Sequence, residues 1–140
     1  MSQAYQALRK KHVAHLNSLL VESTDRLSWF AEELHRHREQ GLRKLVEVAK
    51  NQSPWHQARL AGIAPEDLTE ADLTSIPPMT KADLMEHWDR IVTDRRLTLD
   101  LTRSHLANLT SDDYLLDGHH AVTSGGSTRR EGVFVYDWHA

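Results

Sequence analysis

The residues best suited to chemistry form a run of small and hydroxyl side chains near the C-terminal end. The run reads Thr123-Ser124-Gly125-Gly126-Ser127-Thr128-Arg129-Arg130-Glu131-Gly132 and leads into the apolar run Val133-Phe134-Val135-Tyr136. Because no bulky side chain blocks their approach, the backbone N–H groups and hydroxyls of such a loop can surround a phosphate group. The chemistry that this segment suggests is therefore the binding of a phosphorylated ligand.

Patterns for other chemistries are weak or absent. The sequence contains no cysteine, which excludes disulfides, thiolate catalysis and cysteine-based zinc sites. It has neither the nucleophile elbow G-x-S-x-G nor the Walker pattern G-x-x-x-x-G-K-[ST]. Among the ten histidines, His35 lies near His37, and His119 adjoins His120. Side chains two apart on a helix or adjacent in a strand diverge, so we expect structural histidines and no metal site.

The composition is that of an ordinary globular domain. Charged residues make up 26% and hydrophobic residues 39% of 140 residues. The 17 basic and 20 acidic side chains give a net charge of −3 with histidine counted as neutral, so we expect no nucleic-acid partner and no membrane partner. No apolar run approaches the roughly 20 residues that span a bilayer, and Met1–Leu20 lacks the apolar core of a secretory signal. We therefore expect a cytoplasmic protein.

Residues 1–50 are predicted to form an amphipathic helical region. Ser23-Thr24-Asp25 is typical of a helix start, because short polar side chains can accept bonds from the free N–H groups there. Gly41 weakens the helix that follows and is a place for a break or kink. Before Ser23, apolar residues recur at spacings of three and four and give one stripe, made of Tyr5, Leu8, His12, Leu16, Leu19 and Leu20. These helices are a candidate surface for a protein partner.

Residues 51–122 are predicted to contain several shorter helices. Ser53-Pro54 is a good start signal, because serine caps the helix and proline needs no N–H at its first position. Gly62 supplies the expected stop. Ile76-Pro77-Pro78 must be extended, since proline restricts the residue before it. A weaker helix is expected from Thr98 to Leu109.

Two further segments carry the same start signal. Thr69 and Asp72 have the spacing of a capping box, and Thr80 and Asp83 repeat it. In each, an apolar residue precedes the threonine and another follows the aspartate. The helix after the second box is expected to run from Lys81 to about Val92.

Only the last part of the chain is predicted to form β-structure. The runs His119–Thr123 and Gly132–Trp138 can pair across the glycine-rich loop. Apolar residues on both faces of the second run favour a strand inside a larger sheet, because two strands alone are marginally stable. The prediction is an α+β fold, mainly α, with several helices followed by a C-terminal β-hairpin. The four tryptophans are expected to be core anchors.

The loop resembles the phosphate-binding loop of adenylate-forming enzymes, whose usual pattern is T-S-G-S-T-G-x-P-K-G. Neighbouring segments are similar to the N-terminal part of phenylacetate–CoA ligase-like proteins, over about Leu42 to Asp137. These segments are Ser53-Pro54-Trp55, Ile76-Pro77-Pro78-Met79-Thr80-Lys81-Ala82-Asp83-Leu84, Val92-Thr93-Asp94 and Gly132-Val133-Phe134-Val135-Tyr136-Asp137. The order of the motifs, rather than any one of them, makes the resemblance specific.

The resemblance implies an ATP-dependent, AMP-forming carboxylic acid–CoA ligase. In that family the loop holds the β- and γ-phosphates of ATP while an acid becomes an acyl-adenylate, which a thiol then attacks. ATP is the implied cofactor, and CoA and magnesium are left open. The implied ATP-binding residues are Thr123, Ser124, Gly125, Gly126, Ser127, Thr128 and Gly132.

The middle of the loop departs from the family pattern in either of two alignments. Without gaps, Gly126, Ser127 and Thr128 replace serine, threonine and glycine, and Glu131 replaces the lysine. With one extra glycine, the same three residues match glycine, serine and threonine, and Arg129 replaces the glycine that follows. Arg129 and Arg130 can compensate, since guanidinium groups bind phosphate well.

In the family, the acid-binding core, the acidic residue that contacts the ribose and the catalytic lysine all lie beyond the loop. We therefore expect an N-terminal fragment that is inactive alone, an incomplete piece of an adenylate-forming N-terminal domain. In it, 1–50 is the helical region, 51–122 the start of the large domain and 123–140 a truncated phosphate-loop hairpin. One alternative is a non-catalytic helical interaction module derived from that family, and another is a nucleotide-binding fragment without catalysis.

Overall fold

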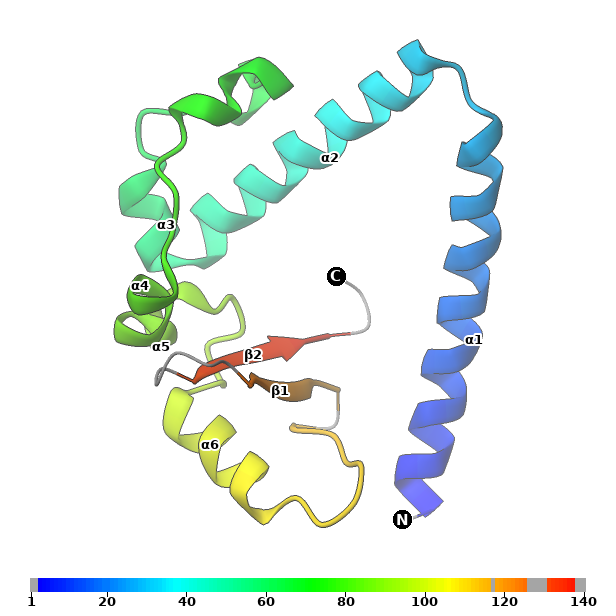
Figure 1. The fold of residues 1–140 in the computed structure, drawn as a ribbon, viewed down its shortest axis with the longest axis vertical. Helices are drawn as coiled ribbons and strands as arrows, with labels where there is room; N and C mark the ends of the chain where they lie inside the picture. Colours follow the sequence, from blue (N-terminus) through cyan, green and yellow to red (C-terminus); the bar gives the residue numbers. More distant parts are fainter. Residues whose placement is uncertain (1–2, 117, 126–130, 138–140) are drawn as a thin grey trace. The chain divides into compact units, whose positions relative to one another are not determined.

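The computed structural model describes residues 3–116, 118–125 and 131–137 (Figure 1). Its contacts divide the chain into two compact units. Unit 1 consists of Met1–Ser28 with Thr98–Ala140, and unit 2 is Trp29–Leu97. The described part is mainly helical and ends in an antiparallel two-stranded hairpin. This confirms the predicted α+β, mainly α class.

Unit 1 joins segments from both ends of the chain. Its helices are α1 (Gln3–Asp25), the 3₁₀ turn η1 (Arg26–Ser28) and α6 (Leu99–Asn108). The hairpin strands are β1 (His120–Ser124) and β2 (Gly132–Tyr136), and α6 contacts both of them (Figure 1). As predicted, Thr98 starts α6: its hydroxyl accepts the N–H of Leu101 at 3.1 Å.

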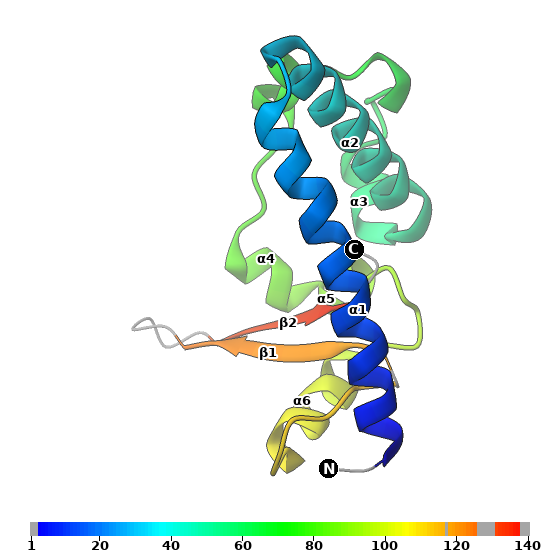
Figure 2. The ribbon, with the colours of Figure 1, turned by 90° about the vertical axis from the view of Figure 1, so that its right-hand side faces the viewer.

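Unit 2 is a single stretch of helices and turns. It contains α2 (Ala31–Gln52), α3 (Pro54–Arg59), α4 (Lys81–Glu86) and α5 (Trp88–Ile91), with the 3₁₀ helices η2 (Pro65–Asp67) and η3 (Glu70–Ser75). In both views α3 lies beside the C-terminal end of α2 (Figure 2). An apolar cluster joins α2 to the segment that follows α3, and consists of Val46, Leu60 and Leu68 with Leu42, Ala49, Ile63 and Ile76.

The start signals of unit 2 are mostly confirmed. Ser53 caps α3 with Pro54 at its first position, and the helix ends at Arg59, three residues before Gly62. Thr80 and Asp83 form a capping box, in which the N–H of Asp83 donates to the Thr80 hydroxyl at 3.1 Å. Thr69 and Asp72 form the other predicted capping box, in which the Asp72 carboxylate accepts the backbone N–H of Thr69 at 2.9 Å, and the helix that follows is 3₁₀.

Two helix boundaries were predicted wrongly. Ser23-Thr24-Asp25 does not start a helix but lies within α1, because the Thr24 hydroxyl donates to the Leu20 carbonyl one turn back. The second helix instead begins at Ala31, where the Glu33 carboxylate accepts the N–H of Phe30 at 2.9 Å. The helix predicted from Lys81 to Val92 is interrupted at His87.

Gly41 does not interrupt the second helix, since α2 is continuous from Ala31 to Gln52. The tryptophans differ in burial. Trp55 and Trp88 are core residues, with 7% and 2% of their surface exposed, whereas Trp29 is 36% exposed. Trp138 lies outside the described residues. Being aromatic was not enough to predict burial.

Candidate phosphate-binding hairpin

The hairpin brings together both ends of the predicted loop. β1 and β2 pair antiparallel in the register His120↔Tyr136 to Ser124↔Gly132. Ser124 and Gly132 form the last pair, so residues 125–131 connect the strands. Among the predicted ATP-binding residues, Thr123, Ser124 and Gly132 thereby lie at the loop end of the paired strands, and Gly125 directly follows Ser124. Figure 2 shows the two strands side by side. Gly126, Ser127 and Thr128 lie outside the described residues.

The end of the ribbon is held by a side chain as well as by strand pairing. The backbone N–H of Gly132 donates to the Ser124 hydroxyl at 3.2 Å. Gly132 is buried and Ser124 half-buried, whereas Thr123 and Gly125 are exposed. This serine–glycine bond was not predicted from the sequence, although the pairing of two strands across the glycine-rich loop was.

The strands are packed unevenly. Val133 is only 1% exposed, but Val122 is 41% and Tyr136 56% exposed. Within the described residues the sheet contains these two strands only. The predicted burial of β2 on both faces is therefore found at its start and not at its end.

An aromatic cluster joins α1 to the base of the hairpin. Tyr114 lies at its centre, with ring centroids 5.1 Å from Tyr5, 5.0 Å from His12 and 4.6 Å from His120. The Tyr5 hydroxyl donates to the Asp112 carboxylate, and His120 Nδ1 lies 3.8 Å from the other oxygen of that carboxylate. Tyr5, His12 and Tyr114 are buried. We call these five residues the tyrosine clasp.

The tyrosine clasp should respond to alkaline pH. Its hydrogen bond to Asp112, followed by burial, raises the pKa of Tyr5 to about 12. Because this pKa lies above the ordinary value of about 10, the contribution of Tyr5 to stability is complete below pH 10. It is lost as the pH rises through 12, since the phenolate cannot donate and repels the carboxylate. The helical circular dichroism signal should therefore fall in that window.

Replacing the carboxylate tests the cause of this shift. In Asp112→Asn the amide oxygen can still accept the Tyr5 bond without a charge, so the ultraviolet titration of Tyr5 should move toward pH 10. The variant Tyr5→Phe shows which of the three tyrosines titrates at the highest pH, because the part of the ultraviolet titration near pH 12 should disappear in it. An unchanged titration curve in Asp112→Asn would contradict the assignment.

The two histidine pairs have separate surroundings. His35 faces Glu39 and Glu70 on the surface of unit 2, whereas the His37 ring packs edge-on against Trp29. His119 is buried, and its neighbour His120 belongs to the tyrosine clasp. In the described part of the chain, no group of three or more histidine, aspartate or glutamate side chains could hold a metal ion.

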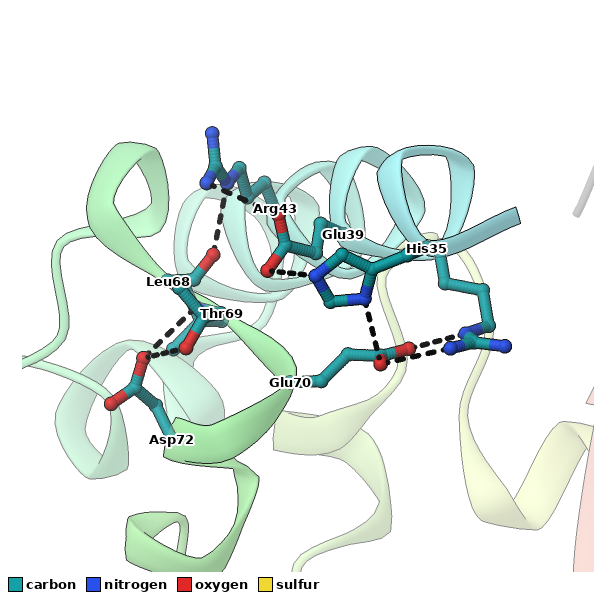
Figure 3. A network of polar contacts seen from close by, with 8 residues as sticks. His35, Glu39, Arg43, Leu68, Thr69, Glu70 and Asp72 are labelled. Atoms are coloured by element: carbon teal, nitrogen blue, oxygen red, sulfur yellow. Dashed lines mark hydrogen bonds and ion pairs between the residues drawn. The ribbon is translucent and has the colours of Figure 1, made fainter. Parts of the chain in front are cut away.

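A network of polar contacts lies in unit 2 (Figure 3). Glu70 at the start of η3 faces α2, where Arg38 donates to it from Nε and Nη2 and His35 Nδ1 lies 3.2 Å away. The hydrogen bonds from Arg38, with a smaller contribution from His35, hold the pKa of Glu70 below its ordinary value. The charges compensate one another, so the network fastens η3 to α2 rather than offering a ligand site.

Arg59 fixes the extended proline segment. Its guanidinium lies 4.3 Å from the centroid of the Trp55 ring and donates to the carbonyls of Pro77 and Pro78 at 2.8 and 3.1 Å. Ile76 is extended, as the following proline requires. Burial, assisted by the charge of Arg59, lowers the pKa of His56. Arg59 thus holds the carbonyls of residues 77 and 78, while the proline ring keeps Ile76 extended.

Comparison with protein-family models, with curated proteins and with solved structures finds no match to this chain. No helix in the described ranges combines the length and the apolar character needed to cross a membrane.

Proposed function

We propose that this chain corresponds to the N-terminal part of an ATP-dependent carboxylic acid–CoA ligase of the adenylate-forming class, and that its hairpin binds the phosphates of ATP. The observation that carries the proposal is the pairing of β1 with β2. It places the two ends of the serine- and glycine-rich loop beside each other, as a loop that surrounds phosphate requires. ATP binding would place the protein in a compartment that contains the nucleotide, such as the cytoplasm.

Nucleotide binding is tested on the 140-residue polypeptide labelled with ¹⁵N. Adding ATP should shift the amide resonances of Gly125 and Gly132, and inorganic triphosphate should shift the same resonances if the phosphates are what is recognised. Adenosine is the matched control, because it carries the base and ribose without phosphate. Shifts with adenosine but not with triphosphate, or no shifts with ATP, would overturn the proposed phosphate site.

Catalysis is a separate question. The groups that bind the acid and the ribose in the family lie beyond the phosphate loop, and the resemblance extends only to Asp137. We therefore expect the 140-residue polypeptide to release no pyrophosphate when supplied with ATP, magnesium and a panel of carboxylic acids. Acid-dependent pyrophosphate release above a no-acid control would show that this polypeptide contains a complete active site.

A second candidate function is a helical docking module, which the surface of α1 favours. In its C-terminal half Leu16, Leu19 and Leu20 are 41%, 37% and 63% exposed, and contiguous exposed apolar residues often mark interaction surfaces. A partner protein that binds the wild-type chain should then not bind the double variant Leu16→Glu, Leu20→Glu. It should still bind the control variant Lys10→Glu, which changes a charged residue of the same helix. Equal retention by all three would contradict docking through α1.

A further inference from the structure

An open hollow in unit 2 has both positive and negative side chains in its walls. Its volume is about 410 Å³, which lies within the range of small-molecule sites. The lining residues are Arg43, Glu47, Lys50, Asn51, Pro65 and Glu66. The first four share one face of α2, and the other two begin η2, which contacts α2. The hollow therefore lies between these two elements.

Two cations of α2 hold the facing segment on either side of η2. The Lys50 ammonium donates to the carbonyl of Ile63, and Nε of Arg43 donates to the carbonyl of Leu68 at 2.9 Å. Ile63 and Leu68 flank η2 in the sequence and belong to the apolar cluster of unit 2. Both cations are half-buried. The fold itself therefore fixes the positions of these two positive charges.

The charged side chains of the hollow retain polar groups that a ligand can use. An ammonium has three N–H donors and a guanidinium has five. Lys50 uses one of its donors for Ile63, and Arg43 uses Nε for Leu68, with Glu39 3.8 Å from its Nη2 (Figure 3). The Glu47 and Glu66 carboxylates are exposed and, among the described residues, neither makes a hydrogen bond or an ion pair.

We propose that this hollow binds a small zwitterion of the α-amino acid class. Arg43 and Lys50 bind its carboxylate, and Glu47 and Glu66 bind its ammonium group. A ligand with both charges meets an opposite charge for each, whereas a ligand of one sign also meets two like charges. Because backbone carbonyls already order both cations, binding them costs little side-chain freedom. The site belongs to unit 2 and goes beyond the phosphate site proposed for the hairpin.

Titration of the ¹⁵N-labelled chain with L-alanine tests the site. L-alanine should shift the amide resonances of Asn51 and Glu66 in a saturable way. Propionate and ethylamine are matched controls, because each has a similar carbon chain and lacks the ammonium or the carboxylate, respectively. Each should bind more weakly by about tenfold or more, since charge-assisted hydrogen bonds are lost. No saturable shift with L-alanine, or equal affinity for L-alanine and either control, would overturn the proposal.

The double variant Glu47→Gln, Glu66→Gln tests which groups bind the ammonium. It removes two exposed negative charges and keeps the shape of both side chains. Its affinity for L-alanine should fall by about tenfold or more, while its affinity for propionate should rise. The matched control is Glu32→Gln, Glu86→Gln, which removes two exposed carboxylates of the same unit outside the hollow and should bind like the wild-type chain. Equal affinity of both double variants for L-alanine would overturn the assignment.

Discussion

Replacing Trp88 by alanine should destabilise unit 2 by about 3–5 kcal/mol, the largest effect that we expect from a single substitution in that unit. Trp88 is 2% exposed and belongs to α5, which contacts α3 and α4. The substitution removes a large apolar side chain and leaves a cavity that three short helices cannot fill. A unit of this size has about that much stability in total, so we expect loss of its ordered structure.

Trp29→Ala is the matched control, because it removes the same side chain from the same unit at a site that is 36% exposed. The Trp29 ring packs edge-on against His37 with 5.4 Å between the ring centroids, and for the loss of such a contact a cost of about 1 kcal/mol is appropriate. Hydrogen exchange of the α3 and α5 amides is the suitable measurement, since two units need not unfold together. Equal protection in both variants would show that Trp88 does not anchor unit 2.

Replacing Tyr114 by alanine should have the second largest effect, again about 3–5 kcal/mol, and should act on unit 1. Tyr114 is 8% exposed and contacts the rings of Tyr5, His12 and His120. Without it, α1 loses the centre of the tyrosine clasp. Most of the stability of a helix in a protein comes from tertiary packing, so α1 should lose helicity as well as its attachment to the hairpin.

Circular dichroism and amide exchange measure the two consequences separately. Tyr136→Ala removes the same side chain from a position that is 56% exposed in the same unit, and should leave α1 helical and protected. Tyr114→Phe keeps the ring and should behave like the wild-type chain to within about 1 kcal/mol. If α1 stays protected in Tyr114→Ala, its attachment does not depend on the tyrosine clasp.

Local signals predicted much of this fold. Helices start at Ser53-Pro54 and at Thr80 with Asp83, as predicted. In both, the capping side chain and the backbone N–H that it binds are three residues apart, so the signal is local. The pairing of β1 with β2 was also predictable, since only seven residues separate the strands, but the register was not predicted. The predicted identity as a phosphate-binding hairpin of the adenylate-forming class stays a proposal.

The wrong or missing predictions concern residues whose structure is determined by a contact with a distant residue or by a competing hydrogen-bond acceptor. Thr24 was expected to cap a new helix, but its hydroxyl has an equally close acceptor in the carbonyl of Leu20. The bond between Tyr5 and Asp112 could not be predicted, because the two residues lie 107 positions apart in the sequence. The bond between Gly132 and Ser124 joins residues only eight positions apart. It was missed because a hydroxyl residue in a glycine-rich loop was interpreted as a ligand-binding residue and not as a structural one.

The distribution of unit 1 over both ends of the chain has a consequence during synthesis. Ribosomes add about 5–20 residues per second, so the 107 residues between Tyr5 and Asp112 correspond to a delay of about 5–20 seconds. During that interval α1 has emerged without its docking site, while unit 2, a continuous segment, can already fold. Tyr5 and His12, which are buried in the folded chain, stay exposed in the newly made segment until the hairpin follows, so chaperones can bind it in that interval.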